Sequence, residues 1–216
     1  FMQLTTGTSS GGNSGFFKML TGQATGGKGG QISVLVGQGN TGRGGDIVVT
    51  SGTTSGARSG GQVVVTSGRS TQTSSGNIIL QTTNAGGSGV SGAILFNTGT
   101  SSSGNTGKMA MTSGRAVGGR GGNIELQVGK GSSKRGGDIL FNAGLTTASQ
   151  TGGFVQVVAG RSSQTSSGII TLDTGDAGQG GITGAIHLRT GISTSGNSGE
   201  FTVDTGNAVG GRGGGA

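Results

Sequence analysis

Apolar residues recur along this chain in pairs separated by one position, and each pair begins fifteen or sixteen positions after the previous one. The fourteen pairs are Met2 and Leu4, Phe17 and Met19, Ile32 and Val34, Ile47 and Val49, Val63 and Val65, Ile78 and Leu80, Ile94 and Phe96, Met109 and Met111, Ile124 and Leu126, Ile139 and Phe141, Val155 and Val157, Ile170 and Leu172, Ile186 and Leu188, and Phe201 and Val203. Alternating apolar positions rich in β-branched residues, as in 46–52, are typical of a β-strand. The pattern predicts one strand for each pair.

The segments between the pairs are rich in Gly, Ser, Thr and Asn, as in 38–45. These residues suit tight turns and positive φ angles, so we expect each such segment to turn the chain back. No segment sustains the apolar spacing of three and four residues that a helix requires. The sequence therefore predicts strands and turns only.

A second period of 92 residues includes six of these short repeats, with steps of fifteen, fifteen, fifteen, sixteen, fifteen and sixteen positions. For example, Gly7, Gly99 and Gly191 open the similar loops GTSSGGNSG, GTSSSGNTG and GISTSGNSG. We expect one continuous domain over 1–216, divided into superrepeats 1–92 and 93–184 and a partial superrepeat 185–216. We also expect it to be a segment of a longer chain or fibre.

The two periods predict an all-β fold, namely a β-solenoid (β-helix) of about 14 rungs, each of fifteen or sixteen residues, with a six-rung superrepeat. One rung offers two large inward side chains, worth about 1.5–3 kcal/mol each on burial, whereas ordering its backbone costs about 1–2 kcal/mol per residue. A rung alone cannot fold. We therefore expect stacked rungs that align residues such as Ile47, Val63 and Ile78 into an apolar core.

Composition narrows the class of protein. The chain has 55 Gly, no Pro and no Cys, which excludes a collagen helix, a polyproline linker and disulfide bonds. Apolar runs fall far short of the roughly 20 residues that cross a bilayer, so no membrane span is expected.

The formal net charge is +7, and six cations recur at matching places in the turns. We call this set the basic ladder: Lys28, Arg43, Arg58, Arg120, Arg135 and Arg212. One interpretation is that the ladder keeps a repetitive surface soluble and offsets nearby Asp46 and Asp138. The other is that it binds a polyanion such as an acidic polysaccharide. Nucleic acid is not expected as a partner, because no aromatic residues are interleaved for base stacking.

Catalytic chemistry has little support in the sequence. His187 is the only histidine, and the seven carboxylates are scattered over different repeats. A cation shared by Asp173, Asp176 and Asp204 lacks a close-spaced ligand motif. The G-x-G-x-x-G match at 37–42 is followed by a predicted strand instead of the helix that a phosphate site needs. We expect no catalytic, cofactor-binding or metal-binding residues and no enzymatic activity.

Alternation along the predicted strands turns Val48, Val64, Ile79 and Leu95 outward on successive rungs. A contiguous column of four exposed apolar residues is typical of an interface. We expect these four residues to form a lateral interface, covered by a second solenoid or by another part of the parent protein. The alternative is that they serve strand propensity only.

The whole chain, through repeats such as GGDIVVTSGTTSGARSGGQVVVTSG, resembles the Gly/Ser/Thr-rich tandem-repeat surface proteins of algae and other microbes, and more loosely β-solenoid adhesins and fibre proteins. That resemblance implies an extracellular or cell-surface structural element. The compact repeats are also similar to insect antifreeze solenoids, but the outward positions lack a regular array of Thr.

Three functions follow from these patterns as expectations. The first is a structural protein that self-associates into an extracellular filament, stalk or fibre by continuous stacking of rungs. The alternative is an adhesin or polyanionic-carbohydrate-binding solenoid that uses the basic ladder. The second alternative is ice binding.

Overall fold

The structure is a computed structural model that describes residues 2–132 and 135–215. The chain divides into two units, Phe1–Met109 and Ala110–Ala216, which are described separately below. Because both units consist of the same kind of repeat, their local geometry can be compared position by position.

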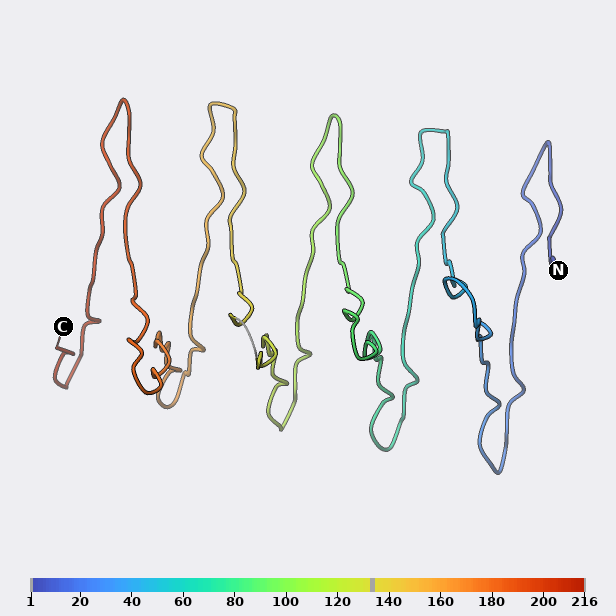
Figure 1. The fold of residues 1–216 in the computed structure, drawn as a ribbon, viewed down its shortest axis with the longest axis horizontal. Helices are drawn as coiled ribbons and strands as arrows, with labels where there is room; N and C mark the ends of the chain where they lie inside the picture. The colour runs from blue at the N-terminus through green and yellow to red at the C-terminus, as the bar shows by residue number, and fades with distance from the viewer. Residues whose placement is uncertain (1, 133–134, 216) are drawn as a thin grey trace. The chain divides into compact units, whose positions relative to one another are not determined.

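The predicted β-solenoid is wrong, because the described residues contain neither a helix nor a strand. Figure 1 draws the chain as a plain tube, with extended segments joined by narrow reversals. The backbone hydrogen bonds of the described part join positions only two to nine residues apart. A ladder between consecutive rungs would instead join equivalent positions of neighbouring repeats, such as 47 and 63. The residues of the apolar pairs are therefore extended but unpaired.

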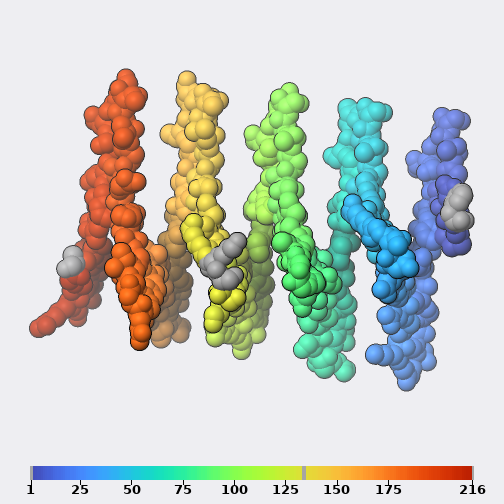
Figure 2. Space-filling view, viewed as in Figure 1, coloured from blue at the N-terminus to red at the C-terminus, as the bar shows by residue number. Residues whose placement is uncertain are grey.

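The predicted apolar core is also wrong. Ile47, Val63 and Ile78, which we expected to face inward, have exposed fractions of 58%, 57% and 52%. No side chain in the described ranges is buried. Figure 2 shows slender columns of atoms within each unit, without a packed block of side chains.

The physical reason is the balance between burial and chain entropy. Ordering one repeat fixes every residue in it, and many of these are Gly, which loses more backbone freedom on ordering than any other residue. Two apolar side chains per repeat recover only a small part of that cost. The prediction assumes that contacts between neighbouring repeats supply the remaining free energy. In this structure the apolar side chains of neighbouring repeats do not bury one another.

What the repeats do form is a series of loops that close at a narrow neck. In each of the fourteen repeats, a Cβ atom on one glycine would contact a residue nine or ten positions earlier. We call these residues the neck glycines: Gly15, Gly30, Gly45, Gly61, Gly76, Gly92, Gly107, Gly122, Gly137, Gly153, Gly168, Gly184, Gly199 and Gly214. Each neck glycine except Gly214 lies just before an apolar segment.

Several necks leave no room for a side chain. A Cβ atom at Gly45 would lie 2.8 Å from Val36 Cγ1, and a Cβ at Gly137 would lie 2.9 Å from Val128 Cγ1. Carbon atoms that are not bonded normally stay about 3.5–4.0 Å apart. A side chain at these positions would therefore force the facing valine to move, and glycine avoids this contact between the two ends of the loop.

Backbone hydrogen bonds close four of the necks. The N–H group of Gly61 donates to the Gly52 carbonyl at 2.9 Å, and its counterpart 92 residues later, Gly153, donates to Gly144 at 3.0 Å. The Ser51 hydroxyl adds a second bond at the first of these necks, to the Gly61 carbonyl at 3.1 Å. The other two closures are Gly76 to Gly68 at 2.9 Å and Gly168 to Gly160 at 2.8 Å.

Local geometry also recurs inside the loops at a spacing of 92 residues. The Ser9, Ser101 and Ser193 hydroxyls accept hydrogen bonds from the backbone three residues later, at 3.1, 3.0 and 2.9 Å. Ser70 and Ser162 each lie 3.0 Å from the hydroxyl of a threonine three residues later. The loops of a superrepeat thus differ from one another, and these hydroxyl interactions return at the equivalent positions of the next superrepeat.

We predict that Gly61→Ala and Gly153→Ala open their necks. An added Cβ would lie 3.2 Å from the Gly52 nitrogen in the first unit and 3.1 Å from the Gly144 nitrogen in the second. The closing hydrogen bond, worth about 0.5–1.5 kcal/mol, should be lost. The amide groups at positions 61 and 153 should then bond to water. Their NMR temperature coefficients should change to the values typical of solvent-exposed amides.

Gly44→Ala is the matched control, because a Cβ there meets nothing within 4 Å. That variant should leave the amide of Gly61 unchanged. Equal effects of Gly44→Ala and Gly61→Ala on this amide would contradict the neck geometry.

Candidate functional site

The basic ladder lies in the loops, directly after tight turns. Gly42 has φ +92°, Gly118 +77° and Gly210 +84°, a backbone region that favours glycine. The ladder cations Arg43, Arg120 and Arg212 follow these glycines by one or two residues. The turns therefore present the cations at the ends of the loops, where the side chains are exposed.

Two ladder cations are paired with carboxylates three residues later. Arg43 Nη2 lies 3.1 Å from Asp46 Oδ1, and Arg135 Nη2 lies 2.7 Å from Asp138 Oδ1. The two arginine side chains remain 86% and 83% exposed, so solvent screens these pairs and they contribute little stability. Each pair offsets the charge of its arginine. The loop with Arg43 is thereby locally neutral, whereas the loop with Arg135 also carries Lys130 and Lys134 and stays positive.

The other cations of the basic ladder have different neighbours. Arg120 Nη2 donates to Asn123 Oδ1 at 3.3 Å, which leaves its charge uncompensated. Lys28 is followed three positions later by Gln31, and Arg58 by a glycine. The loops of the basic ladder thus differ in charge. Each interaction described for a ladder arginine joins it to the residue three positions later.

The residues expected to form the lateral interface are well exposed. Val48, Val64, Ile79 and Leu95 have exposed fractions of 80%, 66%, 73% and 74%. In each case the apolar residue just before them is less exposed, for example Ile94 at 49%. These apolar segments therefore expose both of their faces, and the middle residue is more exposed than the apolar residue before it.

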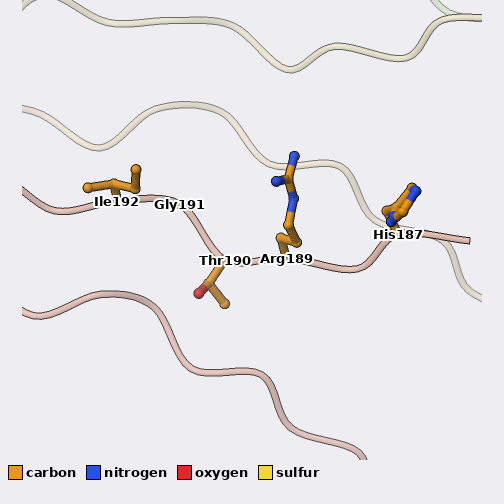
Figure 3. Close-up of a pocket in the computed structure, with 5 residues that line it drawn as sticks. All are labelled: His187, Arg189, Thr190, Gly191 and Ile192. Carbon is orange, nitrogen blue, oxygen red and sulfur yellow. The ribbon is translucent and has the colours of Figure 1, made fainter.

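His187 is one of five residues that line a shallow, open hollow, together with Arg189, Thr190, Gly191 and Ile192. Figure 3 shows His187 and Arg189 on one side of this single segment and Thr190 on the other. A similar hollow over Leu4, Thr5, Thr6, Gly7 and Thr8 lies at the corresponding place two superrepeats earlier. Because that counterpart carries no ionisable side chain, the hollow is a feature of the repeat and not a catalytic arrangement around His187.

Metal and phosphate sites find no support in the described ranges. No group of three or more His, Asp or Glu side chains there comes close enough to hold a metal ion, and Asp173, Asp176 and Asp204 are not brought together. The G-x-G-x-x-G segment forms the start of a loop with Gly42 at its turn. Helices are absent from residues 2–132 and 135–215, so nothing in them could cross a membrane as a helix.

A third hollow lies between two consecutive apolar segments of the second unit. Leu172 from one repeat and Ile186 and Leu188 from the next line it, together with the backbone around Asp173. The hollow is open to solvent, and the exposed fractions of these three apolar side chains are 68%, 53% and 63%. Consecutive repeats therefore leave a gap that apolar side chains from another chain could enter.

The neck glycines are the structural residues that sequence reasoning missed. Their signal is present in the sequence, because each apolar pair from Phe17 and Met19 onward has a glycine two residues before its first member. The composition of the loops explains these glycines only as turn residues in general. Their specific role is the close approach of the two ends of the loop.

Comparisons with protein-family models, with curated proteins and with solved structures give no match to this chain. The functional conclusion therefore rests on the repeats, the exposed apolar segments and the loops.

Proposed function

We propose that this chain is a structural repeat protein that self-associates, through its apolar segments, into an extracellular filament, stalk or fibre. The observation that carries the proposal is the amount of surface that the chain leaves exposed. In contrast to the stacking expected from the sequence, the association joins separate chains and requires no strand.

The exposed area is far larger than that of a folded monomer. The chain exposes 22026 Å² for a mass of 20.6 kDa. A compact monomer of this mass exposes about 8,900 Å², and a fully unfolded chain exposes about 30,000 Å². The excess over a compact monomer is several times the roughly 1,600 Å² that a standard protein interface buries in total. Association of many copies could cover that area.

The distribution of the exposed apolar residues favours a repetitive partner. They lie in segments that recur once per repeat along the whole chain, and the open hollow beside Leu172, Ile186 and Leu188 offers a place for apolar side chains. A globular partner would cover one patch. A partner with the same spacing can cover every segment, and another copy of this chain has that spacing.

The extracellular location in the proposal comes from the resemblance of the repeats to Gly/Ser/Thr-rich surface proteins. A structural role agrees with the composition, because the residues that could support catalysis are few and scattered.

We predict that the double variant Val64→Lys with Ile79→Lys weakens self-association. Each substitution removes an exposed apolar side chain whose burial is worth about 1.5–3 kcal/mol and adds a charge to the interface. The concentration at which large species form, measured by sedimentation velocity, should rise by about tenfold or more.

Ser55→Lys with Ser75→Lys is the matched control, since it adds the same charge to exposed loop positions. This control should assemble close to the native concentration. If both double variants behaved alike, net charge and not the apolar segments would govern assembly.

A second candidate function is binding of an acidic polysaccharide by the basic ladder. The loop turns leave the ladder cations exposed, and Arg58 and Lys28 lack a carboxylate three positions later. Binding of this kind is expected to weaken with salt, because exposed charges are screened over about 8 Å at physiological ionic strength.

We predict that Asp46→Asn with Asp138→Asn strengthens retention on a sulfated-polysaccharide column. The change frees Arg43 and Arg135 from their ion pairs and adds two to the formal net charge of +7. Elution should move to higher salt. Asp173→Asn with Asp204→Asn makes the same change in net charge away from the ladder, and an equal shift in that control would contradict binding by the ladder.

A further inference from the structure

The hollow at His187 and Arg189 has side chains that the equivalent positions of the other superrepeats lack. Those positions hold Leu95 and Asn97 one superrepeat earlier, and Gln3 and Thr5 two superrepeats earlier. None of these four side chains carries a charge. The third superrepeat therefore keeps the hollow of the repeat and adds to it two side chains that can bind an anion.

His187 and Arg189 lie on the same side of one extended segment. Figure 3 shows both side chains on one side of the backbone and Thr190 on the other. Residues two positions apart in an extended chain face the same way, and their Cα atoms are about 6–7 Å apart. A single group placed between the two side chains can therefore contact both.

Both side chains offer hydrogen-bond donors to such a group. The guanidinium group of Arg189 is a planar fork of N–H groups, which fits the paired oxygens of a carboxylate. His187 has at least one ring N–H in either charge state. The described residues contain two ion pairs, Arg43–Asp46 and Arg135–Asp138, and Arg189 takes part in neither. Within the described ranges, no carboxylate of the chain is paired with its guanidinium group.

The hollow also has room for a small ligand and an apolar side chain beside the two donors. Its open volume is about 550 Å³, within the range of about 300–1,000 Å³ that small-molecule sites have. Ile192 lines the hollow and is 98% exposed. A ligand with one anionic group and an apolar face can use the charged and the apolar contacts together. A sugar acid has this combination, because its ring presents C–H groups next to the carboxylate.

Carboxylates flank this site along the chain. Asp173 belongs to the preceding apolar segment, and Glu200 and Asp204 belong to the following one. A densely charged polyanion that followed the chain would be repelled by these carboxylates. A ligand with one anionic group needs only the side chains of the hollow. The hollow therefore favours a different class of ligand from the basic ladder.

We propose that the hollow at His187 and Arg189 is a binding site for a sugar residue that carries one carboxylate. Arg189 holds the carboxylate oxygens, His187 donates a further hydrogen bond, and Ile192 contacts the sugar ring. This inference goes beyond self-association and does not depend on it.

His187 is the only histidine of the chain, so its ring protons report on the site by NMR without further assignment. The full chain is titrated in dilute solution with sodium glucuronate at constant pH and ionic strength, with chloride as the blank and acetate for comparison. We expect a saturable shift of the His187 signals, with a dissociation constant clearly lower for glucuronate than for acetate.

Arg189→Asn introduces the residue found at the equivalent position one superrepeat earlier. It should raise the dissociation constant for glucuronate about tenfold, as expected for the loss of a hydrogen bond between charged groups. Arg161→Asn is the matched control, since it removes the same charge from a loop outside the hollow, and it should leave the dissociation constant unchanged.

The site can also be moved to the corresponding hollow over 4–8. The variant with Gln3→His, Thr5→Arg, His187→Leu and Arg189→Asn keeps a single histidine, whose signals should show the same saturable shift. A shift that does not follow the two side chains to this position would overturn the role of the hollow.

Two results with the native sequence would also overturn the site, namely no saturable shift and equal effects of Arg189→Asn and Arg161→Asn. Equal dissociation constants for glucuronate and acetate would reject the sugar as the ligand. Sedimentation of the same samples measures self-association separately, so failure of this site and failure of the proposed filament are distinguishable.

Discussion

The close approach at the loop necks is the constraint on which the rest of the structure depends. The chain returns to within contact distance of itself once in every repeat, and at Gly61 and Gly153 an added Cβ atom would lie 3.2 and 3.1 Å from the backbone nitrogen of the facing residue. These necks separate the chain into loops and extended apolar segments. The apolar pairs lie outside these loops, and the cations of the basic ladder lie within them or at their ends.

Closure of the loops does not create a core. Most necks bring together small or polar residues, such as Gly52 with Gly61, and two close against an exposed valine. The large apolar residues stay on the surface. One or two hydrogen bonds contribute little stability to a loop, because closing about nine residues has an entropic cost that offsets them. The described part of the chain therefore has local order but leaves its apolar surface exposed, which is the basis of the proposed association with other copies.

Sequence reasoning predicted the repeats and the turns but not the state of the apolar segments. The expected turn at 38–45 contains Gly42 with φ +92°, and Asp46 and Asp138, which one interpretation of the ladder placed near its cations, form ion pairs with Arg43 and Arg135. Turn residues and ion pairs three positions apart depend on local chemistry, which the sequence expresses directly. The β-solenoid was wrong because alternation in Ile47, Val48 and Val49 indicates an extended chain without showing where its backbone hydrogen bonds go. The partners of these hydrogen bonds depend on contacts between repeats or between chains. Each repeat contributes only a small free energy to such contacts.

The central claim is that the apolar segments are covered by other copies of the chain and not by the chain itself. Hydrogen exchange followed by mass spectrometry, in dilute solution and again in assembled material, tests it most directly. The account predicts fast exchange throughout the dilute chain, and protection after assembly in the apolar segment of each repeat, such as 46–50 and 62–66, with the loop turns still exchanging fast. Protection of these segments in the dilute monomer, or no protection at any concentration, would contradict it.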